Sequence, residues 1–341
     1  MRGRLTVAIL GRGRVGSAIA AQLGAARAPF ARRHGVRLDL AGTAGRAGGE
    51  RLVARIRSGR GARLLVDATA ADGMAATQVA LLDAGVHVVT CNKKPLAGPQ
   101  ADWDRLARAA ARSGTAHLHE VTVGAGLPIL KAIRDLRESG DRILSIEGCV
   151  SGTLNFLCDA LDAGRPFAKA LAGAAARGFT EPDPREDLAG GDAARKAIIL
   201  ARAAGFRVEP GDVALRPFVP IPAGGDAAGF VRGAARFDAG LRRRWAAAHR
   251  RGRRLRYIVR VLPPARRGGR ARLAAGLASV DADGPFGRLA GPENIFVVTS
   301  VRYHRHPLVV RGPGAGPEVT AAGAVADILE VARALALRGT G

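Results

Sequence analysis

A short apolar run that ends in a glycine-rich turn is the feature that most constrains this chain. Residues 5–10 read LTVAIL, and residues 11–16, which follow at once, read GRGRVG. A buried strand, the spacing GxGxxG and a following helix typify a dinucleotide-binding unit, because the glycines permit a tight turn, close approach of a pyrophosphate and close helix–strand packing. We therefore predict dinucleotide contacts at Gly11, Gly13, Val15 and Gly16.

The first 125 residues alternate between short apolar runs and helical patterns, which predicts a doubly wound parallel sheet. The expected strands are 5–10, 37–43, 63–69, 86–90 and 116–121, and the expected helices are 17–23, 74–84 and 101–112. From about residue 128 the pattern changes to that of an α+β domain. Its expected helices are 128–138, 154–163, 167–177 and 193–204, its expected strands are 142–150, 255–262, 272–280 and 295–303, and residues 180–191 are expected to form a polar loop. A glycine-rich turn at 312–316 and a long apolar helix at 319–337 follow.

The choice between NAD and NADP depends on the end of the second strand. An acidic residue there would bind a ribose 2′-hydroxyl, whereas an arginine would accommodate a 2′-phosphate. Asp39 lies too early, inside the strand pattern, and Arg46 follows the strand. The sequence thus favours NADP(H) over NAD(H), with Arg46 as the phosphate contact. The alternative is that Arg46 is simply one of many arginines.

Charge is abundant but scattered. The chain has a net charge of +24, with 48 arginines and only five lysines. Nucleic-acid binding needs basic charge gathered on one face and usually aromatic platforms, and aromatic residues make up only 4%. We expect no nucleic-acid partner, and we interpret the dense run 242–256 as a solvated helix face. Because arginine cannot release its proton at working pH, a retained lysine deserves attention as a proton donor.

One lysine lies beside a group of acids. Asp192 and Lys196 are four residues apart at the start of a predicted helix, so both lie on one helical face. The acid-rich segment before them presents Glu181 and Asp187. Carboxylates suit the ammonium group of an amino-acid substrate, and a lysine suits proton transfer to a reacting oxygen. The alternative is a helix cap, a solvated ion pair and a surface loop.

A second lysine follows a predicted strand of the parallel sheet. Asn92 and Lys93 come directly after residues 86–90, at the strand end that faces the ligand crevice in such folds. Lys93 could contact the cofactor or a developing alkoxide, or it could belong to a surface turn.

Several cellular settings are disfavoured. The sequence has no stretch of 18 uncharged apolar residues, so we expect no membrane span. The apolar run after Met1 is too short for a signal peptide. The three cysteines are too few and scattered for a disulfide framework or a zinc site. We therefore expect a cytoplasmic protein.

At this point the motifs resemble a known family. In order along the chain they are GRGRVG, VDAT, HVVTCNKKPLAG, HEVTVGAGLPILKAIRDL, SIEGCVSGTLNF, GFTEPDPREDLAGGDAARKAIILAR and PLVVRGPGAGPEVTAAG. This set is similar to homoserine dehydrogenase over residues 5–337, and it looks like the short form without an aspartate kinase or an ACT domain. The resemblance implies NAD(P)H-dependent interconversion of L-aspartate 4-semialdehyde and L-homoserine, in threonine and methionine biosynthesis.

The resemblance also implies roles for individual residues. Lys196 would exchange the proton, Lys93 would be the second active-site lysine and touch the cofactor, and Glu181 and Asp192, with Asp187 close by, would contact the substrate. Further cofactor contacts would be Thr69 and Gly316. A monovalent cation, Na⁺ or K⁺, would be held by Glu120 and the backbone carbonyls of Val123, Ala125 and Leu127.

The implied architecture is a Rossmann-type doubly wound parallel sheet plus an α+β catalytic and dimerisation domain. We expect residues 1–127, completed by 312–341, to bind the dinucleotide, and residues 128–311 to bind the substrate and form a homodimer. Two alternatives of the same fold remain: another dehydrogenase of amino-acid biosynthesis, such as one using a nucleophilic cysteine, and a catalytically silent homologue. Residues 206–254 carry little of the family pattern.

Overall fold

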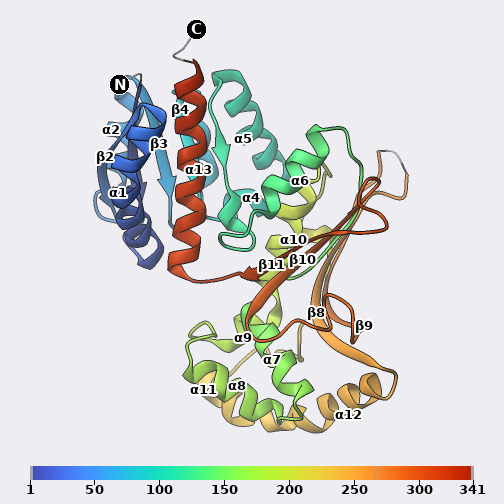
Figure 1. Cartoon of the computed structure of the whole chain (residues 1–341). Helices are drawn as coiled ribbons and strands as arrows, with labels where there is room; N and C mark the ends of the chain where they lie inside the picture. Colours follow the sequence, from blue (N-terminus) through green and yellow to red (C-terminus); the bar gives the residue numbers. More distant parts are fainter. Residues whose placement is uncertain (1–2, 267, 339–341) are drawn as a thin grey trace. The chain divides into compact units, whose positions relative to one another are not determined.

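A computed structural model describes residues 3–266 and 268–338. The chain divides into two compact units (Figure 1). Unit 1 comprises residues 1–130 and 315–341, and unit 2 comprises residues 131–314. Within the described residues, no helix has the length and apolar character needed to cross a membrane.

Unit 1 is built on a five-stranded parallel sheet with the order β2-β1-β3-β4-β5. The chain steps outward from β1 to β2 and then returns past β1 to β3, so right-handed crossovers place helices on both faces. This arrangement confirms the predicted Rossmann-type fold. The strands are β1 (Gly3–Leu10), β2 (Val36–Ala44), β3 (Ala62–Asp67), β4 (Val86–Thr90) and β5 (His117–Leu118).

The core of unit 1 joins the sheet to its first and last helices. Leu5, Val7 and Ile9 of β1 are fully buried and belong to one apolar cluster with residues of α1 and α13. Figure 1 shows α13, in red, standing beside α1. The helices of this unit are α1 (Arg14–His34), α2 (Gly49–Ser58), α3 (Met74–Asp83), α4 (Lys94–Ala97), α5 (Gln100–Ser113) and α13 (Pro317–Arg338).

Two predicted elements of unit 1 have the wrong length. The first helix runs over residues 14–34 rather than 17–23, because its alanine-rich sequence meets no left-handed terminating glycine before Gly35, which has φ 71°. The strand expected at 116–121 is reduced to two residues, and Glu120–Thr122 form a short 3₁₀ helix, η1.

Unit 2 contains a six-stranded mixed sheet with the order β11-β10-β6-β8-β9-β7. Its neighbouring strands are antiparallel except for β7 and β9. The strands are β6 (Ile143–Cys149), β7 (Val213–Leu215), β8 (Arg253–Leu262), β9 (Arg272–Asp281), β10 (Glu293–Ser300) and β11 (Leu308–Pro313). The helices are α7 (Gly152–Asp162), α8 (Phe167–Ala176), α9 (Pro184–Ala189), α10 (Gly191–Ala203), α11 (Ala227–Arg232) and α12 (Asp238–His249), and α6 (Ile129–Glu138) spans the boundary between the units.

The arginine run at 242–256 is only partly the solvated helix face that we predicted. Arg242, Arg243 and Arg244 are exposed on α12. Arg256 instead lies on β8 with 1% of its surface exposed, where it pairs with the buried carboxylate of Asp162. Burial requires such a partner, and the other guanidinium N–H groups donate to backbone carbonyls, which include that of Phe286 at 3.1 Å.

Candidate functional site

The glycine-rich turn lies at the carboxyl edge of the parallel sheet, between β1 and α1. Gly11 has φ +117°, and a Cβ there would lie 2.5 Å from the Ala68 carbonyl oxygen. A Cβ on Gly16 would lie 2.0 Å from the Gly11 carbonyl oxygen, so the helix packs directly against the turn. A Cβ on Gly13 would meet nothing within 4 Å. The turn is therefore tight on the protein side and open on the other, which is the cradle that a pyrophosphate requires.

The segment after β2 presents two arginines. Arg46 is exposed just beyond the last residue of the strand. The stem of Arg12, from the glycine-rich turn, lies against the same segment, because a Cβ on Gly45 would be 3.8 Å from its Cγ and Cδ. Asp39 pairs in mid-strand with Thr6 and forms ion pairs with Arg37 at 2.7 Å and with Arg4. No acid therefore ends β2 at the position that would bind a ribose hydroxyl.

A buried polar network connects the ends of β3 and β4. The carboxylate of Asp67, fully buried, accepts hydrogen bonds from the backbone N–H and hydroxyl of Thr69 at 3.0 and 2.6 Å, and from Gln78 at 2.8 Å. Burial raises the pKa of Asp67 above its usual value, against these hydrogen bonds. Asn92 donates to the Ala71 carbonyl at 2.8 Å. The network fixes both strand ends, including the one that carries Thr69.

The two adjacent lysines after β4 differ in their surroundings. Lys94 forms an ion pair with Asp72 at 2.8 Å. Lys93 is half-buried at the start of α4, and its carbonyl accepts the N–H groups of Leu96 and Ala97. Lys93 therefore stands at the carboxyl edge of the sheet, where the sequence predicts it. Its contact with a cofactor remains a prediction.

The predicted cation ligands lie in an irregular buried loop of unit 1. Val123 and Ala125 are buried, and Ala125 is the one non-glycine residue among those described that has a positive φ, at 51°. The Glu120 carboxylate accepts the Leu130 N–H at 2.7 Å. The Leu127 carbonyl accepts the Ile129 N–H at 2.8 Å. Carboxylate and carbonyl oxygens are the ligand types that suit a hard cation, and a cation at this loop stays a prediction.

Gly316 precedes the first residue of α13 and has φ +123°. Its carbonyl accepts the N–H and hydroxyl of Thr320 at 3.0 and 2.8 Å. The glycine thus begins the helix in a conformation that other residues rarely adopt, and its predicted cofactor contact is untested by this geometry.

In unit 2 the predicted polar loop at 180–191 is wrong in part, because residues 184–189 form the helix α9. Asp183 caps this helix by accepting the Arg185 N–H at 3.0 Å, Pro184 occupies the first position, and Gly190 ends the helix with φ 78°. Asp, Pro and Gly at these positions are ordinary helix signals that the sequence interpretation passed over. Gly190 also begins α10, so Asp192 lies in the first turn.

Lys196 is buried in α10, and its ammonium contacts Asp192 and the Val150 carbonyl. Its ammonium lies 2.8 Å from Asp192 Oδ2 and donates to the Val150 carbonyl oxygen at 2.6 Å. The i, i+4 pair expected from the sequence is thus present. Only 8% of the lysine is exposed, whereas the Asp192 side chain is 44% exposed. A cation held at the edge of the interior beside a solvent-facing carboxylate can exchange a proton with a bound molecule.

Asp187 completes the acidic group around this helix start. It accepts the Glu181 N–H at 2.8 Å and the Thr153 hydroxyl at 3.1 Å. Burial raises the pKa of Asp187, and the negative charges of Glu181 and Asp192 add to that effect. Thr153 was missed by the sequence interpretation. The Ser151 N-cap at the start of α7 was the available signal.

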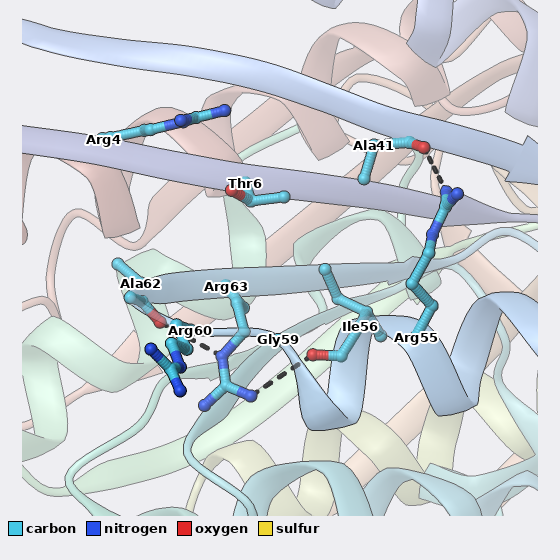
Figure 2. A pocket seen from close by; sticks show the side chains of 10 residues that line it. Arg4, Thr6, Ala41, Arg55, Ile56, Gly59, Arg60, Ala62 and Arg63 are labelled. Carbon is cyan, nitrogen blue, oxygen red and sulfur yellow. Dashed lines mark hydrogen bonds between the residues drawn. The ribbon is translucent and has the colours of Figure 1, made fainter.

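A separate cavity lies at neither of these places. It encloses about 370 Å³ toward the amino end of the parallel sheet, between β1, β3 and α2 (Figure 2). Arg63 donates to the Arg57 carbonyl at 2.6 Å and to the Ala84 carbonyl at 2.9 Å, and Arg55 donates to the Ala41 carbonyl. These arginines hold helix ends and loops, and none of the residues that line the cavity is a predicted site residue.

The cysteines are free thiols and poor nucleophiles. Burial raises the pKa of Cys91 to about 12, and it raises the pKa values of Cys149 and Cys158 as well. A thiolate nucleophile needs a lowered pKa. The alternative dehydrogenase that uses a catalytic cysteine is therefore disfavoured.

Comparison with protein-family models decides the family. The model of homoserine dehydrogenase matches residues 128–329, and that of the homoserine dehydrogenase NAD-binding domain matches residues 11–120. The chain belongs to the homoserine dehydrogenase family. The resemblance noted in the sequence is confirmed, and an NAD-binding domain points to a nicotinamide cofactor.

Individual relatives extend this result. A chloroplastic bifunctional aspartokinase/homoserine dehydrogenase of Arabidopsis thaliana is 41% identical over 79% of this chain and 29% of its own length. The homoserine dehydrogenase of Emericella nidulans is 35% identical over 81% of this chain and 77% of its own. A solved structure of a Candida auris protein of unknown function, 31% identical, superposes with a TM-score of 0.87 over 96% of this chain and 98% of that one. The chain spans about three tenths of the bifunctional relatives.

Proposed function

We propose that this protein interconverts L-aspartate 4-semialdehyde and L-homoserine with NADP(H). The observation that carries the proposal is the buried Lys196, bonded to Asp192 and grouped with Asp187 and Glu181, in a chain of this family. The nicotinamide-binding cradle of unit 1 supports it.

The cofactor supplies a hydride to the aldehyde carbon when it is bound. The residues of unit 2 stabilise the negative charge that develops on the substrate oxygen and supply the proton that this oxygen receives. As the carbonyl oxygen gains negative charge, the Lys196 ammonium stabilises it and then gives it a proton. Asp192 keeps the lysine charged until that moment, because an adjacent carboxylate favours the ammonium form.

The acidic side chains serve the substrate's α-ammonium group. Glu181 and Asp192 are exposed enough to reach a bound amino acid. Asp187 is half-buried and bonded to the Glu181 backbone, so it orders the loop that carries Glu181.

The experiment that tests the function is a spectrophotometric assay. Purified protein is mixed with L-homoserine and either NADP⁺ or NAD⁺ at alkaline pH, and the absorbance of the reduced cofactor is followed. We expect homoserine-dependent reduction, faster with NADP⁺ at limiting concentration. A folded protein that binds NADP⁺ but reduces none of it with homoserine would show the silent homologue instead.

NADP preference is assigned to Arg46, with the neighbouring Arg12 in support. Arg46 follows β2, and the stem of Arg12, from the turn after β1, lies against the same segment, where a 2′-phosphate would lie. We expect Arg46→Ala to raise the Kd for NADP⁺ about tenfold, since a hydrogen bond to a charged group contributes roughly 1.5 kcal/mol, and to leave that for NAD⁺ nearly unchanged. Isothermal titration with each cofactor measures this. Arg242→Ala on α12 is the charge-matched control, and equal losses for both cofactors would refute the assignment.

A monovalent cation, Na⁺ or K⁺, is proposed for the loop containing Glu120. The ligands would be its carboxylate and the carbonyls of Val123, Ala125 and Leu127. If a cation is held there, Tm should rise with K⁺ or Na⁺ more than with tetramethylammonium at equal ionic strength. Glu120→Gln should abolish that difference, and an identical Tm in all three salts would remove the site.

The protein is further proposed to be a cytoplasmic homodimer without a nucleic-acid or membrane partner. Free thiols suit a reducing compartment. Large apolar side chains are exposed around β10 and β11 of unit 2, namely Val301, Tyr303 and Val309 at 52%, 42% and 44%. Sedimentation velocity over a range of concentrations should give the mass of two chains, and a monomer throughout would exclude the dimer.

A further inference from the structure

The Val150 carbonyl oxygen has a second donor besides the catalytic lysine. Asn294, at the start of β10, donates through Nδ2 to this oxygen at 3.2 Å, while Lys196 Nζ donates to it at 2.6 Å. A carbonyl oxygen has two lone pairs and can accept both bonds. Asn294 and Val150 are each 1% exposed, so the shared acceptor lies in the interior, where such bonds are electrostatically strong.

The orientation of Asn294 is determined by its surroundings. Its Nδ2 also lies 3.5 Å from the Gly314 carbonyl oxygen, so the nitrogen faces two acceptors and must be the amide's inward atom. A Cβ on Gly314 would fall 2.0 Å from the Asn294 side chain, which leaves the amide no other place. Its Oδ1 is buried without a hydrogen-bond partner. A buried acceptor without a hydrogen bond destabilises the fold. Because Asn294 keeps this orientation despite that cost, we infer that the hydrogen bonds of its Nδ2 determine where the side chain lies.

We propose that Asn294 is a positioning residue for the proposed reaction: by holding the Val150 carbonyl it fixes where the Lys196 ammonium stands and how strongly that ammonium is held. The inference rests on the proposed role of Lys196 in proton transfer. Two donors on one oxygen compete for its electron density, so Asn294 weakens the hold of Val150 on the ammonium. A less tightly held ammonium gives up its proton more readily.

The chain offers a matched control. Asn155 of α7 is also a buried asparagine, 2% exposed, whose Nδ2 donates to a backbone carbonyl, that of Glu293, at 2.6 Å. Its Oδ1 is likewise buried without a partner. Asn155 therefore matches Asn294 in residue type, burial and bonding, but its Nδ2 donates to the carbonyls of Glu293 and Cys149 and not to that of Val150. A purely structural role would make the two residues behave alike.

The test compares Asn294→Ala, Asn294→Asp and Asn155→Ala with the wild type. Loss of the competing donor should raise the pKa of Lys196. A carboxylate at position 294 would lie within roughly 6 Å of the Lys196 ammonium, because both groups contact the same carbonyl oxygen. Its negative charge should raise the pKa of Lys196 further, about tenfold in the equilibrium constant. In homoserine oxidation, where neutral lysine accepts the proton, the rising limb of the kcat profile should move to higher pH in the order wild type, Ala, Asp. The KM for NADP⁺ should stay unchanged.

Other charged groups stay constant across this series, so a shift reports on position 294. On its own helix Lys196 faces Asp192, and the elements packed around it contribute further groups. These are Arg185, Glu186, Asp187, Asp212, Arg253, Arg254, Arg256, Arg260, Arg272 and Asp281, and Glu181 lies beside Asp187. Tyr257 is neutral throughout, because burial raises its pKa to about 12.

A second readout keeps the proposal independent of activity. The chain has only five lysines, so the ¹³Cε resonances of labelled lysine resolve Lys196, assigned with Lys196→Arg. Its titration should move upward in the Asn294 variants and not in Asn155→Ala, although all three lower Tm. A loss of Tm with an unmoved Lys196 titration, or equal movement in Asn155→Ala, would overturn the proposal. A wild type without homoserine oxidation would overturn the function while leaving this titration to judge Asn294.

Discussion

The proposed function gives Lys196 two tasks, charge stabilisation and proton transfer, and a charge-conserving change separates them. Arginine rarely acts as a proton donor, because its pKa lies far above the working pH. In a chain with 48 arginines, a lysine that is 8% exposed and bonded to both Asp192 and Val150 supports the proposal of a role that arginine cannot fill.

We therefore expect Lys196→Ala to lower kcat roughly 10²–10⁴-fold, the usual contribution of a general acid–base group, with little change in cofactor affinity. Lys196→Arg should not restore the rate, since the charge alone is insufficient. Steady-state kinetics with homoserine measure both, and circular dichroism checks the fold. Near-native turnover of Lys196→Arg would move proton transfer to Lys93 or to water.

At the scale of elements, the junction of α9 and α10 explains how the acidic group reaches the lysine. One glycine, Gly190, ends the first helix and begins the second, with φ 78°. A Cβ at this position would lie 2.1 Å from the hydroxyl of Tyr257, which donates to the Arg216 carbonyl at 2.8 Å. The turn is thus fixed by backbone conformation and by a neighbouring side chain together.

Gly190→Ala should lower the free energy of unfolding by about 2–4 kcal/mol, through left-handed strain of roughly 1 kcal/mol and a steric clash. The double variant Gly190→Ala with Tyr257→Phe should recover part of this loss, because the clashing oxygen is gone. Urea unfolding of both, with Tyr257→Phe alone as the reference, gives the comparison. If the losses of unfolding free energy in the two single variants simply add in the double variant, the Tyr257 hydroxyl does not clash with a side chain at position 190.

The sequence predicted the elements whose signals are local. The parallel sheet followed from apolar runs such as residues 5–10 and 63–69, and the pair Asp192 and Lys196 followed from helical spacing. The short helix α9 was missed although its capping residues are visible, because acidic residues were interpreted as a loop. The Val150 carbonyl and Asn294 could not be predicted, since they meet only through the pairing of β6 with β10.

At the scale of the whole molecule, a strongly basic chain buries two of its arginines, Arg202 and Arg256, inside unit 2. Arg256 is 1% exposed and Asp162 has a side chain that is 3% exposed. Burial alone would raise the pKa of Asp162, but the hydrogen bonds and charges of Arg256, His249 and Arg254 outweigh it and hold that pKa below its usual value. A carboxyl of this kind stabilises the fold above its unfolded pKa of about 4 and loses that contribution as pH falls through its lower folded pKa.

Asp162→Asn should therefore cost about 3–5 kcal/mol at pH 7, because it leaves a buried guanidinium without its counter-charge. It should also flatten the loss of stability between about pH 5 and pH 2, the range in which the native carboxylate protonates. Asp283→Asn, on a carboxylate that is 91% exposed and 3.9 Å from Arg288, should change stability by about 1 kcal/mol or less. Thermal unfolding across pH measures the stability of both variants. Equal losses in Asp162→Asn and Asp283→Asn would show that the buried ion pair contributes no more than an exposed one.

The scarcity of lysine has a practical consequence for anyone who wishes to attach this protein to a surface. Of its five side-chain amines, Lys131 and Lys169 are exposed, Lys93 and Lys94 are half-buried, and Lys196 is enclosed. Both exposed amines belong to unit 2. Amine-coupling resins and sensor chips should therefore tether the side chains of unit 2 in preference to those of unit 1, which leaves the glycine-rich turn available for immobilised cofactor-binding measurements.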